Sequence, residues 1–558
     1  MGVMARLGNA LGIMPTPAPT NLPTVIQPRA GYMRDGRGTV FSRWLPALRS
    51  SRDDIAAAWS AAAARTVELW QNNGWISGMV DQATANTVGS GLRLRAMPEN
   101  ELFGMDEKAA QKWRKSVEAK WELWSNTPVE CDIEGKLTIA QMTDAAFRQW
   151  IVFGEILAEI TWRVRRGSQT GTKVRMLSPT RIVNKSDPFS RLHSGVRLDA
   201  DGMPMGYVVT KDNPLIGIEE FEVLARDQYG RPKIIHVFMG QPGQTRGIGI
   251  LVPILRVAKQ FDQLADATLL ASIIQTVFAA SIESEAPTEE TLRALLNPRE
   301  QALLLAEGGA PFDVFAAAKD GWAEGHPIDV GFAGRIAHMF PGEKLNFHSP
   351  EQPATAYKEF SLHLLREMAR CLGLTYESAT GDYEGATYSS VRMAVNEIFA
   401  ITKARRKFLL SPFLQSIYEA WLEEKIEAGE IEFPGGIDNF IAHRAAACRA
   451  KWTGDPKPVA DDLKSGKTHE LYRNMGIMSD QTIADDLGLD IEDEYAQRAR
   501  EKEMREDYGL PDNFYPQSLI ATEQSKTPRE GVLLPSKIRG PRTSIEEMED
   551  DDDSDTDA

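Results

Sequence analysis

The chain has 558 residues, more than a single hydrophobic core usually organises, so several domains or an elongated subunit of several parts are expected. Its 63 basic and 79 acidic residues give a formal net charge of −16, which excludes a protein that captures nucleic acid over its whole surface. The three cysteines, Cys131, Cys371 and Cys448, are widely spaced, which excludes a disulfide framework and indicates free thiols in a reducing cytoplasm.

Residues 1–45 are predicted to form a proline-rich N-terminal arm. Prolines recur from Pro15 to Pro28 and prevent a regular helix, and no acidic residue precedes Asp35. The apolar run before these prolines is too short for a signal peptide. Further on, Ala267–Ile282 is uncharged but shorter than the roughly 20 residues of a membrane span, so we expect a buried helix there.

Residues 46–250 are predicted to be an α+β unit in which helices come first and strands follow. The helices are expected at 53–73, 75–87, 106–124 and 139–153, and the strands at 92–96, 155–164, 173–177, 195–198, 206–210 and 234–238. An acidic residue, Asp53, is expected to cap the first helix. In the third helix Trp113, Val117, Trp121 and Trp124 share one face, which is typical of a core or a subunit interface rather than of a cofactor site.

One helix of about thirty residues, about 45 Å long, is predicted from Val252 to Ile282. A small separate unit follows, with a capped helix at 288–296, an Ala/Gly-rich stretch at 308–334, and a short strand that ends at the turn 340–342. A second helix, Ala354–Leu372, then returns. The alternative is a central helix in the core of a monomer.

A polar loop, Tyr376–Ser390, follows the returning helix, which stops at Gly373. A long helix is predicted from Ser389 to Ala428, with a kink at Pro412. This helix contains a basic run, Lys403, Arg405, Arg406 and Lys407, that fits either a ring of positive charge or, our preferred interpretation, a solvated or salt-bridged face. On pattern alone, the polar loop is a surface loop between two helices.

The remaining chain is predicted to contain short helices at 467–475, 479–487 and 491–508. From residue 509 proline and polar residues dominate, and Asp550–Asp553 are consecutive, so residues 509–558 are predicted to be a disordered acidic tail. No enzyme, cofactor or metal is expected. Ser465–Thr468 resembles the end of a phosphate loop without its first glycine, and the HExxH, GxSxG and GxGxxG patterns fail. Glu377, Asp382 and Glu384 lack the burial that general acid–base catalysis needs.

Four stretches carry a family resemblance: LLREMARCLGLTYESATGDYEGATYSSVRMAVNE, FMGQPGQTRGIGILVPIL, VFAASIESE and HMFPGEKLNF. With them the chain resembles the lambda-type family of tailed-phage portal proteins, in order, from about residue 45 to about 500. The resemblance implies a mainly helical α+β subunit with wing, stem, clip and crown. The implied parts are a wing at 46–250, a stem helix at 251–283, a clip at 284–350, a returning stem helix at 351–373, a tunnel loop at 374–390, a long kinked helix and wing return at 391–450, and crown-like helices at 451–508.

The resemblance implies a ring, expected to be a dodecamer, that assembles in the host cytoplasm and sits at one capsid vertex of the virion. It would nucleate procapsid assembly with the major capsid protein or scaffold and conduct double-stranded DNA during packaging and ejection. The clip would dock the terminase large subunit and later a head–tail adaptor. The acidic tail, if it faces the capsid interior, would organise DNA or bind a scaffold. The alternatives are a membrane-associated or pore-forming phage protein and a DNA-processing enzyme.

The tunnel loop is the expected point of contact with moving DNA. A continuous basic lining would bind the duplex and slow its passage, whereas acids, hydroxyls and glycines touch the backbone weakly. The expected DNA-channel residues are Tyr376, Glu377, Gly381, Asp382, Tyr383, Glu384, Gly385, Thr387, Tyr388 and Ser389.

Overall fold

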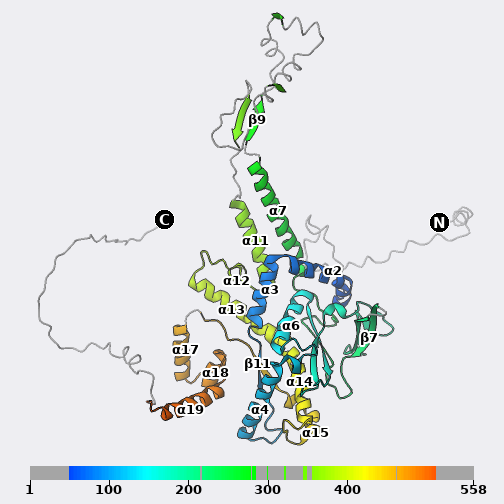
Figure 1. The fold of residues 1–558 in the computed structure, drawn as a ribbon, viewed down its shortest axis with the longest axis vertical. Helices are drawn as coiled ribbons and strands as arrows, with labels where there is room; N and C mark the ends of the chain where they lie inside the picture. Colours follow the sequence, from blue (N-terminus) through cyan, green and yellow to red (C-terminus); the bar gives the residue numbers. More distant parts are fainter. Residues whose placement is uncertain are drawn as a thin grey trace, which may run out of the picture. The chain divides into compact units, whose positions relative to one another are not determined.

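The computed structural model describes residues 49–213, 217–277, 280–284, 298–299, 320–321, 343–347, 355–459 and 462–510. The chain divides into two compact units, one up to Ala460 and one from Asp461 (Figure 1). The predicted N-terminal arm, most of the predicted clip and residues 511–558 of the predicted acidic tail lie outside the described residues.

The first unit opens with five helices. They are α2 (Ser51–Asn72), α3 (Gly74–Thr87), α4 (Glu107–Ser125), α5 (Pro128–Cys131) and α6 (Ile139–Phe153). Polar side chains cap the first turns of all of them except α5. The cap of α2 is Ser50, which accepts a hydrogen bond from the Asp53 amide, so the prediction that Asp53 is the cap was wrong by one turn. Asp53 instead lies inside the first turn, where its charge favours the helix dipole.

Two antiparallel sheets follow these helices. The three-stranded sheet has the order β3-β2-β8, with β2 at Glu155–Trp162, β3 at Thr172–Met176 and β8 at Ile234–Phe238. The four-stranded sheet has the order β4-β5-β6-β7, with β4 at Leu192–His193, β5 at Val196–Leu198, β6 at Pro204–Asn213 and β7 at Gly217–Leu224. Strands β4 and β7 were not predicted. The alternation in β7, GIEEFEVL, leaves apolar side chains exposed, so its pattern lacks a clear buried face.

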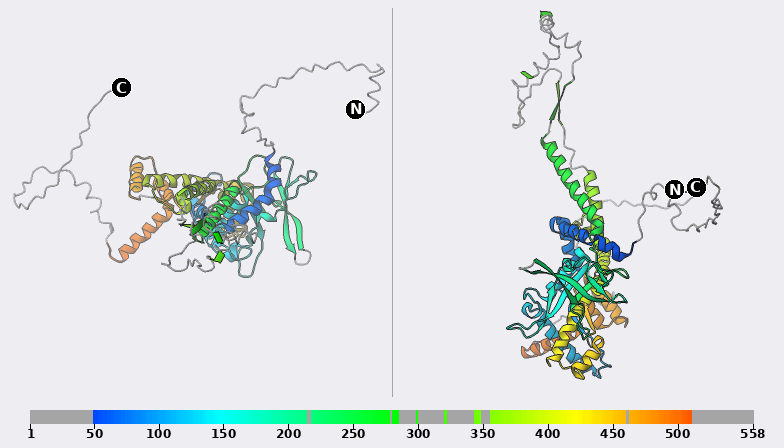
Figure 2. Two further views of the ribbon diagram at one scale, coloured as in Figure 1. Left: turned by 90° about the horizontal axis from the view of Figure 1, so that it is seen from above. Right: turned by 90° about the vertical axis from the view of Figure 1, so that its right-hand side faces the viewer.

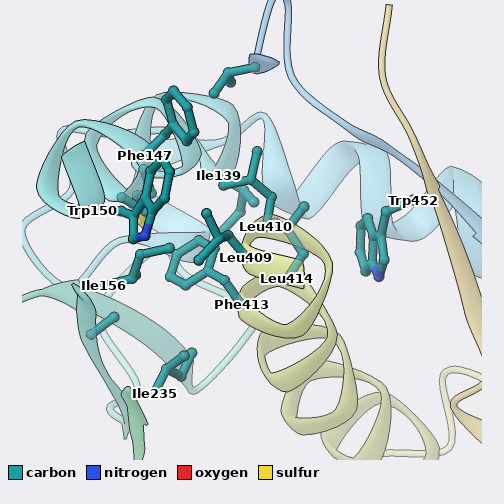
Figure 3. Close-up of a cluster of buried hydrophobic side chains, with 14 of the residues drawn as sticks. Ile139, Phe147, Trp150, Ile156, Ile235, Leu409, Leu410, Phe413, Leu414 and Trp452 are labelled. Atoms are coloured by element: carbon teal, nitrogen blue, oxygen red, sulfur yellow. The ribbon is translucent and has the colours of Figure 1, made fainter. Parts of the chain in front are cut away.

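The hydrophobic core joins segments that are far apart in the sequence. The predicted tryptophan face of α4 is buried, and Trp121 packs edge-on against Tyr418 and Trp421. Figure 3 shows Phe147 and Trp150 of α6 and Ile156 of β2 facing Leu409, Leu410 and Phe413. The C-terminal part of the first unit therefore completes the core that α6 and β2 begin.

The predicted thirty-residue helix is shorter than expected. A 3-10 turn, Val252–Ile254, precedes α7 (Leu255–Val277), and residues 280–282 belong to strand β9 (Ala280–Ser284). Strand β9 pairs with β10 (Glu343–Phe347), so cross-strand pairing outweighs the local helical tendency. The strand predicted to end at the turn 340–342 lies outside the described residues, and β10 follows that position. Helix α11 (Thr355–Leu372) returns beside α7, as Figures 1 and 2 show.

The long helix predicted from Ser389 is interrupted. It consists of α13 (Tyr388–Arg405), the π-helical turn η3 (Arg406–Leu410) and α14 (Ser411–Glu427). Pro412 lies in the first turn of α14, where its missing N–H costs nothing, and the irregular turn falls just before it. Beyond α14 come α15 (Gly436–Ala442), α16 (Arg444–Ala447) and β11 (Ala450–Thr453), which pairs with β1 (Arg93–Ala96).

The second unit consists of α17 (Asp462–Asn474), α18 (Asp480–Asp486) and α19 (Ile491–Asp507), close to the predicted helices. Residues 451–453, at the start of the predicted crown-like part, belong to strand β11 of the first unit. Ser465–Thr468 lies within α17 and forms no phosphate loop. Among the described helices, none is long and apolar enough to cross a membrane.

Candidate functional site

The segment between α11 and α13 contains an additional helix. Gly373, with φ of 71°, turns the chain out of α11, and Thr375 caps the short helix α12 (Tyr376–Thr380). Gly381, also at φ 71°, ends α12 in the left-handed conformation that glycine adopts readily. Helix α13 then begins at Tyr388. The predicted loop Tyr376–Ser390 is therefore shortened to Gly381–Thr387, which we call the channel loop.

The other predicted DNA-channel residues lie in helices. Tyr376 and Glu377 belong to α12, and Tyr388 and Ser389 form the first turn of α13. Thr387 caps α13 through a reciprocal capping box with Ser390. Both ends of the channel loop are therefore fixed by helix caps, which is a local reason for a short loop.

The acids of the channel loop contact their own subunit. The Tyr376 hydroxyl donates to Asp382 Oδ2 at 3.0 Å, and the Glu384 amide donates to Asp382 Oδ1 at 3.0 Å. The Glu384 amide and then the Tyr376 hydroxyl lower the pKa of Asp382. Glu384 in turn forms an exposed ion pair with Lys358 of α11 at 3.3 Å. Exposed pairs of this kind contribute less than about 1 kcal/mol, so the loop can leave this arrangement at little cost.

Helix α13 is largely uncovered. Thr402 and Arg405, both near its C-terminal end, are its buried residues, and Met393 is two-thirds exposed at 66%. Beneath the helix lies a pocket of about 290 Å³, lined by residues of α3, α12 and α13 and by Tyr383, Arg406, Asp455, Pro456 and Pro458. The buried contacts of α13 therefore lie at its C-terminal end, while its N-terminal part and the channel loop are partly or fully exposed.

Arg405 forms the first contact of this anchor. Its Nη2 donates to the carbonyl of Leu372, the last residue of α11, at 2.7 Å. Its guanidinium lies 5.3 Å from the centre of the Trp150 ring. Burial lowers the pKa of Arg405 to about 10, so this cation remains charged at neutral pH. A cation at a helix C-terminus also satisfies carbonyls that lack a partner within the helix.

Arg406 makes the equivalent contact with another helix. Its Nε donates to the carbonyl of Thr87, the last residue of α3, at 2.7 Å, and its Nη1 donates to the Asp455 carbonyl at 2.8 Å. Burial lowers the pKa of Arg406. Two consecutive arginines at the junction of α13 and η3 thus bind the C-terminal carbonyls of α11 and α3. We call Arg405, Arg406 and their carbonyl partners the helix joint.

The contacts of the helix joint differ from the prediction for the basic run Lys403, Arg405, Arg406 and Lys407. Arg405 is buried and Arg406 is half-buried, and both bind backbone carbonyls, so neither is part of a solvated or salt-bridged face. Lys403 and Lys407 are exposed, and each lies over an aromatic ring of its own helical segment, Phe399 and Phe408. For these lysines the basic ring stays a prediction.

A second anchor lies where the chain leaves the sheets for α7. Glu155, fully buried at the start of β2, accepts hydrogen bonds from Arg246 Nη2 at 2.6 Å and from the Gly247 amide at 2.7 Å. His236 Nε2 lies 3.0 Å from the same carboxylate. Burial alone would raise the pKa of Glu155, but Arg246 and His236 outweigh it and the pKa lies below its ordinary value.

A family profile that matches most of the chain decides to which family the chain belongs. The profile of the family described as "Phage portal protein, lambda family" matches residues 37–406, which is more than half of the chain. The chain belongs to this family. It is therefore a phage portal protein, a structural component of the virion at the head–tail connection rather than an enzyme.

The chain is also similar to individual portal proteins and to a chain of one solved structure. The portal protein of Escherichia phage N15 is 28% identical over 87% of this chain and 92% of its own length. Portal protein B of Escherichia phage lambda is likewise 28% identical over 87% of this chain and 92% of its own length. Among solved structures, a chain from the neck of an empty GTA particle has a TM-score of 0.43 at 14% identity, and the match covers 79% of this chain and 99% of that one.

The sequence predicted the portal family, but it did not predict the helix joint or the buried contacts of Glu155. The basic residues of the helix joint were visible as a run, yet nothing in the sequence pairs Arg405 with Leu372, 33 residues away, or Arg406 with Thr87, 319 residues away. Glu155 and Arg246 are similarly 91 residues apart. Among the described residues no cluster of three or more His, Cys, Asp or Glu side chains could hold a metal ion, and all three cysteines are free.

Proposed function

We propose that this portal protein assembles into a closed ring, a dodecamer, at one capsid vertex, and that double-stranded DNA passes through the ring during packaging and ejection. Membership of the lambda portal family over residues 37–406 is the observation that carries the proposal. Identical copies that contact each other head to tail close into a ring when the equal rotations between neighbours add up to one full turn.

The helices proposed as the stem support this assembly. On α7, Leu269 and Leu270 are exposed at 62% and 57%, and on α11 Phe360 is exposed at 54%. Large apolar side chains on two neighbouring helices are typical of surfaces that another protein covers. In the ring, the same helices of the adjacent copies cover them.

The channel loop is proposed to contact the DNA. Most of its residues are exposed, and its acidic, hydroxyl and glycine residues offer no continuous positive surface to the phosphates. Asp382 and Glu384 are held by Tyr376 and Lys358 rather than by a buried partner, so the loop can yield as the duplex moves. Contact without strong binding suits a conduit.

The remaining parts of the subunit and its partners are proposed from the family resemblance. Residues 46–250, 251–283, 284–350 and 351–373 are proposed as wing, stem, clip and returning stem, and residues 451–508 as the crown-like helices. The clip would dock the terminase large subunit and then a head–tail adaptor, and the ring would nucleate the shell with the major capsid protein or scaffold.

Negative-stain electron microscopy of the purified full chain, with its mass in solution, tests the ring. We expect rings with a central hole and a mass that is a whole multiple of the 61.9 kDa subunit. A chain that remains monomeric under assembly conditions would contradict the proposal.

A further inference from the structure

The connection between β2 and β3 carries a concentrated positive charge. It reads RVRRGSQTG, and Arg163, Arg165 and Arg166 are all exposed. None of the three forms an ion pair with another residue that the structure describes. In a chain with a formal net charge of −16, three unpaired cations within four residues make a local positive surface. We call residues Trp162–Gly167 the basic tip.

Two carboxylates beside the connection point to its backbone and not to the arginines. Glu424 of α14 accepts hydrogen bonds from the Gly171 amide at 2.5 Å and from the Thr172 amide at 2.7 Å. Glu130 of α5 accepts hydrogen bonds from two further amides of the connection, at 2.8 and 3.0 Å. Because their oxygens are held by amides, these acids fix the connection and leave the charge of the basic tip uncompensated.

A buried lysine fixes the same connection from β3. The side chain of Lys173 is 0% exposed, and its Nζ donates to the Glu130 carbonyl at 2.7 Å and to the Ser168 hydroxyl at 2.6 Å. Burial is the main cause that lowers the pKa of Lys173. Lysine is rarely buried unless its ammonium group is satisfied in this way. The basic tip therefore stands on a rigid base, which reduces the entropy that binding would cost.

Trp162, the last residue of β2, adds an aromatic surface to the basic tip. It is 62% exposed, and its ring lies against Gly171, where an added Cβ would be 2.5 Å from two ring atoms. The backbone at Gly171 therefore supports the ring while most of the side chain stays exposed. Rings of this kind stack on nucleic-acid bases, and arginine binds phosphate through two parallel hydrogen bonds.

We propose that the basic tip binds a nucleic-acid strand, with Arg163, Arg165 and Arg166 on the phosphates and the Trp162 ring stacked on a base. An acidic protein segment would satisfy the arginines but would leave the ring without a stacking partner. The contact differs from that of the channel loop, because unpaired arginines bind phosphates firmly. It does not depend on the proposed ring, since all of these residues belong to one subunit.

Fluorescence anisotropy of labelled oligonucleotides, titrated with the full chain, tests the proposal with single-stranded and duplex DNA of equal length. The triple variant Arg163→Gln, Arg165→Gln, Arg166→Gln should bind both probes at least about tenfold more weakly at low salt. For the duplex, the slope of log K against log salt concentration should fall by about 2–3, because each phosphate contact contributes about 0.9. A wild-type chain that binds neither probe would overturn the proposal, whether or not it forms rings.

The matched control removes the same charge from three exposed lysines, in the triple variant Lys108→Gln, Lys112→Gln, Lys185→Gln. It should change the affinity less than about twofold. Equal losses in the two triple variants would overturn the proposal, because general charge and not the basic tip would then hold the DNA.

The aromatic ring and the class of ligand are tested separately. Trp162→Ala should weaken binding of single-stranded DNA at least about fivefold and binding of the duplex less, because the single strand offers unpaired bases. An unchanged affinity for the single strand would overturn the proposed stacking. Polyglutamate of equal length should displace the labelled strand much less effectively than unlabelled DNA. Equal displacement would indicate an acidic protein partner and would contradict the proposal.

Discussion

Replacing Glu155 by glutamine is expected to destabilise the first unit strongly. The carboxylate is fully buried and accepts hydrogen bonds from Arg246 Nη2 at 2.6 Å and from the Gly247 amide at 2.7 Å. Glutamine keeps one acceptor oxygen but directs an amide nitrogen at one of these donors. It also leaves the Arg246 guanidinium, which is 1% exposed, without a counter-charge.

The magnitude follows from the burial. Removing one partner of a buried ion pair costs about 3–5 kcal/mol, because the remaining charge is left uncompensated in a medium of low polarity. A matched control lies on the same strand: Glu159 pairs with Arg175 at 3.0 Å, but the two side chains are 21% and 38% exposed. Glu159→Gln should therefore cost about 1 kcal/mol or less.

Urea unfolding of the monomeric chain, followed by tryptophan fluorescence, measures both variants. Because the pKa of Glu155 lies below its ordinary value, its contribution is present above about pH 4.5 and is lost as the pH falls below it. The difference between wild type and Glu155→Gln should therefore shrink below pH 4.5. Equal losses for Glu155→Gln and Glu159→Gln at pH 7 would refute the reasoning.

Other predictions concern the helix joint and the channel loop. Arg405→Met should reduce stability by about 1–3 kcal/mol, because it leaves the buried Leu372 carbonyl without its donor. Lys403→Met, the control, should change stability by less than about 0.5 kcal/mol, because Lys403 is exposed. Equal shifts of the melting temperature in the two variants would contradict the role of Arg405 in the helix joint. Replacing Asp382–Ala386 by glycine and serine residues keeps the helix caps Gly381 and Thr387, so it should leave ring formation intact and reduce DNA packaging in a reconstituted assay. Normal packaging by that variant would remove the channel loop from the DNA path.

Helices with a clear apolar period and a polar cap were predicted well. Helix α6 runs from Ile139 to Phe153 as expected, with a capping box at Thr138 and a glycine, Gly154, at its end. The helices of the second unit were also found, although they bury almost nothing, because caps such as Ser479 mark their starts. Local signals therefore located most elements of the fold.

The errors arose where distant residues decide the local structure. Residues 280–282 look helical on their own, but they pair with a strand more than sixty residues later, across Ile282 and Leu345. The basic run was interpreted as a solvated or salt-bridged face because the chain is net acidic. Arg405 and Arg406 instead satisfy carbonyls of helices that the sequence does not place beside them. Such pairings become visible only in the folded chain.

Photo-crosslinking during packaging tests most directly whether the channel loop touches moving DNA. A photoreactive residue replaces Tyr383, which is 54% exposed in the channel loop, or, as the matched control, Tyr229, which is 63% exposed in the turn between β7 and β8. The account predicts DNA adducts at position 383 and none at position 229. Adducts at position 229 alone, or none at position 383 while DNA is being packaged, would contradict it.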